Sequence, residues 1–186
     1  MSTTNIILGT SGDDTLDGTV GDDTIRVGDG GDSINGSGGA DDIDGGAGND
    51  NIAGGPGNDT IYGSDGNDYI DSNSGSDTVH GGAGDDYFAT LFSQGNDVLY
   101  GDDGNGRFDL RAASGQALRV YGGAGDDLFN AWIYQDSTIT VTVTGGSGID
   151  IRVQNDPFYY RCSHCLGHLQ TASKRAQRPV TDAGPV

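Results

Sequence analysis

Glutamate is absent from this chain of 186 residues, although aspartate supplies all 28 acidic side chains against nine lysines and arginines. Both acids carry the same charge, so a need for negative charge alone would not select one of them. The choice of the shorter side chain indicates carboxylates that are held close to their own backbone. The formal net charge of −19 and the lack of a basic stripe before residue 157 argue against nucleic acid as a partner.

Other absences narrow the function. No run approaches the roughly 18 apolar residues of a membrane span, and residues 1–8 lack the basic start and apolar stretch of a cleaved secretion signal. Without glutamate, neither an H-E-x-x-H metalloprotease motif nor an EF-hand loop is present. No serine lies in G-x-S-x-G, and the single lysine, Lys174, lies in no P-loop. We therefore expect a protein without catalytic activity.

Glycine, by contrast, occurs 35 times and recurs with a period of nine. Nine blocks follow one another without insertion over residues 9–89, as in 45–53 (GGAGNDNIA), and position four of each block is glycine. Position six is always aspartate: Asp14, Asp23, Asp32, Asp41, Asp50, Asp59, Asp68, Asp77 and Asp86. Position eight is always a large apolar residue: Leu16, Ile25, Ile34, Ile43, Ile52, Ile61, Ile70, Val79 and Phe88. Such a polar composition is typical of disorder, but this strict register favours a folded repeat.

One block can be interpreted physically. Glycines at positions one, two and four allow positive φ angles and close backbone approach, as a sharp turn requires. The last three residues form a short strand that directs the position-eight side chain inward. Two blocks then make one flattened coil of 18 residues, and coils stack at roughly 4.8 Å. The apolar row becomes a thin core that only stacking can bury.

Stacking also brings the position-six carboxylates of successive coils together. The expected pairs are Asp14 with Asp32, Asp23 with Asp41, Asp32 with Asp50, Asp41 with Asp59, Asp50 with Asp68, Asp59 with Asp77, and Asp68 with Asp86. Like charges about 5 Å apart repel by about 0.8 kcal/mol in water and about 3 kcal/mol at an effective dielectric of 20, so the bare stack should not form. Calcium accepts six to eight oxygens in irregular geometry, whereas magnesium demands a strict octahedron and zinc prefers nitrogen or sulfur. The sequence predicts several calcium ions held by paired carboxylates and turn carbonyls.

These residues resemble the G-G-x-G-x-D-x-U-x repeats, U being a large apolar residue, of repeat-in-toxin (RTX) or haemolysin-type calcium-binding proteins. The resemblance implies an all-β fold, a right-handed parallel β-roll (a β-solenoid), which folds when calcium is present. It also implies a secreted, extracellular protein exported by a type I system. Two alternatives stay open: an accessory module of a secreted enzyme or toxin (protease, lipase or epimerase), or a structural or adhesive protein. The corresponding partners are an associated catalytic domain or a cell-surface polysaccharide, and the oligomeric state is not indicated.

Beyond residue 89 the register slips. The next block contains eleven residues but recovers an acidic residue at Asp97, and block 101–109 carries Gly106 where the aspartate belongs. A regular block returns at 122–130 with Asp127. We add Asp97 and Asp127 to the candidate calcium ligands, although the sequence does not fix their stacking neighbours.

The remaining segments are less regular. Residues 137–144 alternate threonine with isoleucine or valine, which predicts a half-buried capping strand, and 145–153 form a last worn repeat with Asp150 at position six. Phe129, Trp132 and Tyr134 form an aromatic cluster that we interpret as core packing.

The chain is thus divided into an N-terminal leader strand or cap (1–8), a regular calcium-binding roll (9–89), degenerate repeats with capping strands (90–156), and a basic tail (157–186) that we expect to be disordered. In the tail, Cys162, His164, Cys165 and His168 resemble half a zinc site with no second half in the sequence.

Overall fold

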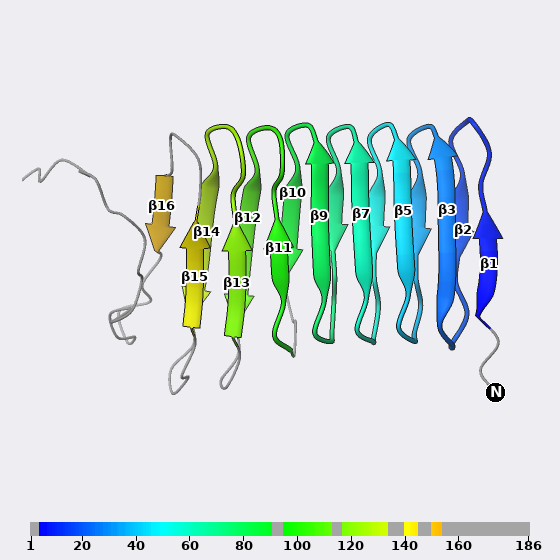
Figure 1. Ribbon diagram of the computed structural model, residues 1–186, viewed down its shortest axis with the longest axis horizontal. Helices are drawn as coiled ribbons and strands as arrows, with labels where there is room; N and C mark the ends of the chain where they lie inside the picture. The colour runs from blue at the N-terminus through cyan, green and yellow to red at the C-terminus, as the bar shows by residue number, and fades with distance from the viewer. Residues whose placement is uncertain (1–3, 91–94, 113–116, 134–139, 145–149, 154–186) are drawn as a thin grey trace, which may run out of the picture.

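The computed structural model describes residues 4–90, 95–112, 117–133, 140–144 and 150–153, and every regular element in them is a β-strand. The sixteen strands pair in parallel and form two eight-stranded sheets, one of odd-numbered and one of even-numbered strands (Figure 1). The all-β prediction is confirmed. The described residues include no helix that could cross a membrane.

Strand lengths differ between the two sheets. The odd sheet contains β1 (Asn5–Leu8), β3 (Asp23–Asp29), β5 (Asp42–Ala47), β7 (Thr60–Asp65), β9 (Thr78–Ala83), β11 (Val98–Tyr100), β13 (Ala117–Tyr121) and β15 (Thr140–Thr144). The even sheet contains β2 (Thr15–Asp17), β4 (Ser33–Asn35), β6 (Asn51–Ala53), β8 (Tyr69–Asp71), β10 (Tyr87–Thr90), β12 (Arg107–Ala112), β14 (Leu128–Ile133) and β16 (Asp150–Val153). Strands β2 to β8 of the even sheet have the expected three residues. The odd strands β3 to β9 are longer because the start of the following turn also pairs, as Gly28 does with Gly46.

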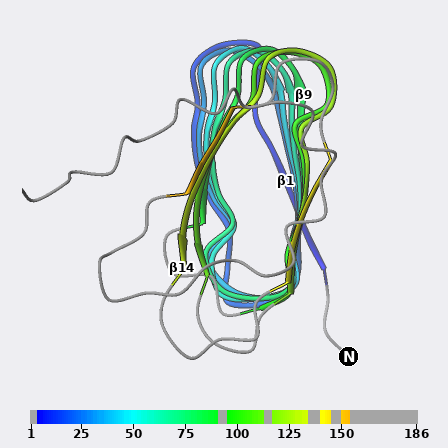
Figure 2. The same cartoon turned by 90° about the vertical axis from the view of Figure 1, so that its left-hand side faces the viewer.

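The strands wind into a right-handed coil. In Figure 1 the odd strands run upward in front, the even strands run downward behind, and each later coil lies farther to the left. Seen end-on, the coils superpose as a flattened loop with turns at both ends (Figure 2). Asn5 pairs with Asp23 and Asp65 with Ala83, each 18 residues further along the chain. The predicted right-handed β-roll of 18-residue coils is therefore confirmed for this part of the chain.

Later coils are longer but remain in the same two sheets. Thr78 pairs with Val98, twenty residues on, and Val98 pairs with Arg119, twenty-one residues on. Ala117 then pairs with Thr140, twenty-three residues on. The sheets tolerate these additions because strand pairing uses backbone groups, which are present whatever the turn sequence is. The degenerate repeats thus extend both sheets beyond the regular blocks.

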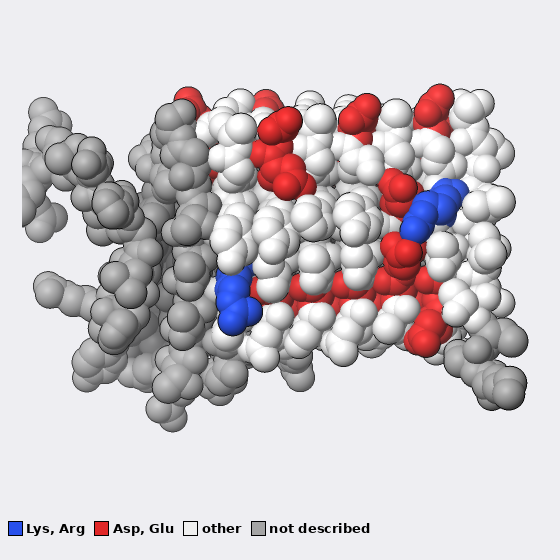
Figure 3. Space-filling model, viewed as in Figure 1, with Lys and Arg blue, Asp and Glu red and all other residues white. Residues whose placement is uncertain are grey.

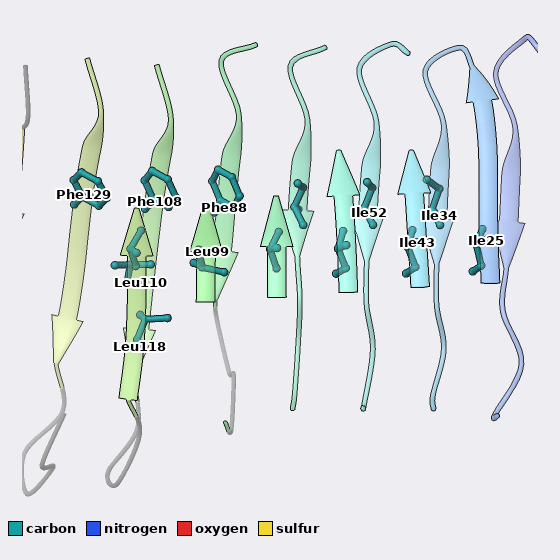
Figure 4. Packing of buried hydrophobic residues seen from close by; sticks show 14 of the residues in the cluster. Ile25, Ile34, Ile43, Ile52, Phe88, Leu99, Phe108, Leu110, Leu118 and Phe129 are labelled. Carbon is teal, nitrogen blue, oxygen red and sulfur yellow. The ribbon is translucent and has the colours of Figure 1, made fainter. Parts of the chain in front are cut away.

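The core is a narrow double row of position-eight side chains between the sheets (Figure 4). Twelve residues with at most 2 % exposure form these rows: Ile25, Ile34, Ile43, Ile52, Ile61, Ile70, Val79, Phe88, Leu99, Phe108, Val120 and Phe129. Val27, Leu110 and Leu118 also belong to the buried core. Toward the C-terminal end the rings of Phe88, Phe108 and Phe129 stack, with centroids 4.5 and 4.8 Å apart. Phe129 is a core residue as expected, whereas the Trp132 side chain and Tyr134 lie outside what the structure describes.

Candidate metal sites

The position-six carboxylates are buried where each turn enters its strand. From Asp23 to Asp97, and again at Asp127, their exposure is 1 or 2 %. Figure 3 shows acidic groups as a continuous row along the roll, with further acidic groups along the upper edge of the same face. A buried carboxylate is strongly unfavourable unless hydrogen bonds or an opposite charge compensate for its lost hydration. Each oxygen of these side chains therefore has to be accounted for.

One carboxylate oxygen, Oδ1, accepts a hydrogen bond from the preceding coil. The backbone N–H of Asp14 donates to Oδ1 of Asp32 at 2.7 Å. The same bond, at 2.8–2.9 Å, joins Asp23 to Asp41, Asp32 to Asp50, Asp41 to Asp59, Asp50 to Asp68, Asp59 to Asp77, and Asp68 to Asp86. All seven pairs expected from an 18-residue coil are confirmed as stacked neighbours.

The other oxygen, Oδ2, has no hydrogen-bond donor in eight of these carboxylates. They are Asp32, Asp41, Asp50, Asp59, Asp68, Asp77, Asp86 and Asp127. A methyl group built on Gly45 would lie 2.5 Å from Oδ2 of Asp50 and 2.9 Å from the carbonyl oxygen of Gly63, one coil further on. A β-carbon at Gly45 would therefore occupy the space beside these two oxygens, although Val27 and Ser72 stand at position one of the blocks that carry Asp32 and Asp77.

This arrangement fits a hard cation. A buried carboxylate oxygen without a donor is an unsatisfied acceptor, which costs about 1–3 kcal/mol. Calcium binds carboxylate and carbonyl oxygens together. Among the described residues, no three histidine, cysteine or acidic side chains come together as a metal cluster. Backbone carbonyl oxygens and water are accordingly the groups that would complete a calcium site formed by two carboxylates.

The pKa values of the central carboxyl groups also indicate that burial destabilises their negative charge. Burial, opposed by the N–H donor from the preceding coil and reinforced by neighbouring carboxylates, raises the pKa of Asp59 and Asp68 to about 6. The same causes raise the pKa of Asp77 and Asp86 to about 7. A negative charge at these positions is destabilised unless a cation accompanies it.

The structure also places the two candidates beyond the regular blocks. The N–H of Asp77 donates to Oδ1 of Asp97 at 3.0 Å, so Asp97 stacks on a carboxylate twenty residues earlier. Oδ1 of Asp127 instead accepts from the N–H of Gly106 at 2.9 Å. Gly106 therefore occupies the stacked position of the aspartate, as the sequence indicated, and Asp127 has no carboxylate directly before it. Asp150 begins β16, and its side chain lies outside what the structure describes.

Two turns at the N-terminal end differ from the rest. The N–H and hydroxyl of Thr10 donate to Oδ2 of Asp14 at 2.6 and 2.9 Å. Thr19 donates in the same way to Oδ2 of Asp23, at 2.5 and 3.0 Å, and the Asn5 amide donates to its Oδ1 at 3.0 Å. Burial raises the pKa of Asp23, but the hydrogen bonds from Thr19 and Asn5 outweigh it and leave the pKa lowered. The chain's own donors thus satisfy these two candidate ligands.

Sequence reasoning missed a second polar ladder, at position five. The N–H of Gly31 donates to Oδ1 of Asp13 at 2.9 Å, and the N–H of Asn67 donates to Oδ1 of Asn49 at 2.8 Å. In this ladder the acceptor lies in the earlier coil, the reverse of position six. The signal was visible: seven of the nine regular blocks carry a polar side chain there, namely Asp13, Asp22, Asn49, Asn58, Asn67, Ser76 and Asp85.

The residues of the proposed zinc half-site, Cys162, His164, Cys165 and His168, lie outside what the structure describes. His80 is placed on the outer face of the odd sheet, where its Nδ1 lies 3.0 Å from Oδ2 of Asp102. Its ring stacks between those of Tyr62 and Tyr100, at centroid distances of 5.2 and 4.5 Å. This histidine is therefore part of a surface stack, away from the buried carboxylates.

Comparison with known families agrees with this geometry. The RTX calcium-binding nonapeptide repeat (4 copies) matches residues 2–34, 17–52, 44–79, 53–88, 93–108 and 119–132, more than half of the chain. The chain belongs to the RTX calcium-binding repeat family. These RTX repeats imply calcium binding and a β-roll, and the matches include the segments that carry Asp97 and Asp127. The comparison with curated proteins found no match to this chain.

Proposed function

We propose that this RTX protein binds several calcium ions between stacked turns, with position-six carboxylates and turn carbonyls as ligands. The observation that carries the proposal is the set of eight buried Oδ2 atoms that have no donor. Calcium supplies a positive charge that both neutralises the stacked carboxylates and coordinates the carbonyl oxygens beside them. The chain's residues hold the ligands in register through the N–H to Oδ1 bonds of successive coils.

Calcium binding is further proposed to drive folding of the roll. The position-six sites exist only when coils are stacked, so the free energy of binding becomes free energy of folding. The hydrophobic core is only one side chain deep on each sheet, and the net charge of −19 opposes compaction. Without calcium, we expect the electrostatic cost of stacking to exceed what this thin core supplies.

We infer a secreted protein whose role is structural or accessory rather than catalytic. RTX repeats are typical of secreted proteins, and extracellular calcium-binding modules work at about 10⁻⁴–10⁻³ M calcium. The repeat pattern occupies most of the described residues, and the sequence carries none of the catalytic motifs considered above. A calcium-stiffened roll suits either a spacer or adhesive element, or the repeat module of a secreted enzyme or toxin.

The test is a calcium titration of protein that has been treated with a chelator. Circular dichroism should show little β structure in the chelator and a cooperative gain of β structure as calcium reaches the millimolar range. Calorimetry in parallel should return several ions per chain, and magnesium at the same concentration should produce neither change. Full β content in the chelator would contradict the coupling to folding, and an equal response to magnesium would contradict a calcium-selective site.

A further inference from the structure

The residue at position two, four residues before each carboxylate, separates the satisfied sites from the unsatisfied ones. All eight carboxylates with an open Oδ2 follow a position-two residue with positive φ. These residues are Gly28 (φ 119°), Ser37 (73°), Gly46 (100°), Gly55 (101°), Ser64 (80°), Asn73 (63°), Gly82 (107°) and Gly123 (94°), which precede Asp32, Asp41, Asp50, Asp59, Asp68, Asp77, Asp86 and Asp127 respectively.

The two satisfied carboxylates follow threonine instead. Thr10 and Thr19 do not have positive φ, and their N–H groups donate to Oδ2 of Asp14 and Asp23. Threonine is branched at Cβ, and a positive φ brings such a side chain into conflict with its own backbone. Glycine adopts this region freely, and serine or asparagine does so at a modest cost.

The sign of φ at position two determines whether the N–H of that residue faces the carboxylate. A change of sign turns over the peptide that joins positions one and two relative to the rest of the turn. The threonine turns present this N–H to Oδ2, whereas the positive-φ turns withdraw it and leave Oδ2 without a donor.

We propose that position two selects the turns that take calcium, and that Thr10 and Thr19 close Asp14 and Asp23 to the ion. This inference rests on the calcium-binding function proposed above. The first coil is then a metal-free end of the roll. Its location fits this role, because among the described residues β1 and β2 are the terminal strands of their sheets. Asn5 supplies to Asp23 the donor that a preceding aspartate N–H supplies elsewhere.

The first test opens the closed turns. Thr10→Gly/Thr19→Gly removes both branched side chains, and its folded, calcium-saturated form should bind two more ions than wild type by native mass spectrometry. Thr19→Gly alone should bind one more. Thr19→Val is the matched control, because valine keeps the branched Cβ and the N–H while losing the hydroxyl, and it should bind the wild-type number.

The second test closes an open turn. Ser37→Thr should bind one ion fewer than wild type, because a branched residue at φ 73° favours the closed turn at Asp41. Ser37→Gly keeps the positive φ and should retain the wild-type number. If the Thr10→Gly and Thr19→Gly variants fail to fold, the two Ser37 variants still test whether position two selects the calcium-binding turns. A wild-type protein that binds no calcium would overturn the proposed function, whereas unchanged ion counts in all the variants of a calcium-binding wild type would overturn this inference alone.

Discussion

At the scale of the residue, the carboxylate at position six carries two separate tasks. Its Oδ1 accepts the N–H that fixes the stacking of coils, and its Oδ2 lies beside position one of its own block, as Oδ2 of Asp50 lies beside Gly45. An asparagine at this position still offers one oxygen to the N–H of the preceding coil. It removes the charge and replaces the second oxygen with a donor, so it should retain the stacking and lose the ion.

The first prediction compares Asp77→Asn with Asp65→Asn. Asp77 is buried in the middle of a row of stacked position-six carboxylates, whereas Asp65 is exposed at the edge of a turn. In saturating calcium, Asp77→Asn should lower the free energy of unfolding by about 1–3 kcal/mol and reduce the number of bound ions, while Asp65→Asn should change neither. Urea unfolding with calcium and native mass spectrometry measure the two effects. Equal behaviour of the two variants would count against Asp77 as a ligand.

Individual residues also show where sequence reasoning reached its limit. The aspartates of position six and the gap at Gly106 were predictable, because a strict period places them in register. The closure of Asp14 by Thr10 was not, since it depends on the φ of one residue rather than on the repeat. The stacking of Asp97 on Asp77 was not predictable either, because the coil that joins them contains two additional residues.

At the scale of the element, the turns depend on backbone contact between successive coils. Gly48, at position four, has a φ of 132°, and a β-carbon there would overlap the carbonyl oxygen of Gly30 in the preceding coil. Gly12 occupies the same position in the first block, where a β-carbon would meet nothing within 4 Å. Glycines at the same position of the repeat therefore differ in whether a β-carbon can be accommodated there.

The second prediction follows from this difference. Gly48→Ala should lower the free energy of unfolding by about 1–3 kcal/mol, through both the strained φ and the overlap with Gly30. Gly12→Ala should be neutral or slightly stabilising, because alanine restricts the unfolded chain. Thermal unfolding in calcium compares the two variants. A tolerated Gly48→Ala would show that the coils are less closely stacked than described.

The third prediction concerns the strands that continue the roll without regular turns. Phe108 is fully buried between Phe88 and Phe129. Phe108→Ala should cost about 3–5 kcal/mol, because this stack provides the core where Gly106 interrupts the carboxylate column. Val20→Ala, at a side chain that is 94 % exposed, should stay within about 0.5 kcal/mol of wild type. Urea unfolding in calcium tests both variants, and a small effect at Phe108 would indicate a loosely packed C-terminal part.

At the scale of the whole molecule, the two rows of buried position-six carboxylates make the stability of the folded state depend on pH. Burial raises the pKa of Asp59 and Asp68 to about 6, and that of Asp77 and Asp86 to about 7, from 3.8. The folded state thus binds more protons than the unfolded state in this interval. Its proton-linked stability is fully present below about pH 4 and is lost as the pH rises through 6 to 7.

The fourth prediction is that mild acid partly replaces calcium. In a chelator, the β content from circular dichroism should be higher near pH 4 than at pH 7.5. In limiting calcium the dependence should be opposite, because protons compete with the ion and calcium affinity should fall below pH 7. A chelated protein whose β content rose with pH would contradict the assignment of buried, charge-destabilised carboxylates.

The overall architecture was largely predictable from the period of nine. Two blocks per coil, one inward residue per strand and glycine turns lead directly to two parallel sheets, and β1 to β10 follow that plan. The continuation through β11 to β16 was less apparent, because coil lengths of 20, 21 and 23 residues obscure the period. Inward apolar residues such as Leu99 and Val120 maintain the core there without the turn consensus.

The most direct measurement is long-wavelength anomalous diffraction from crystals grown in calcium, which locates each ion independently of the protein coordinates. We predict calcium peaks beside the Oδ2 atoms of the eight open carboxylates, from Asp32 to Asp86 and at Asp127, and none beside Oδ2 of Asp14 or Asp23. A folded roll without calcium peaks between its stacked turns would contradict the central claim.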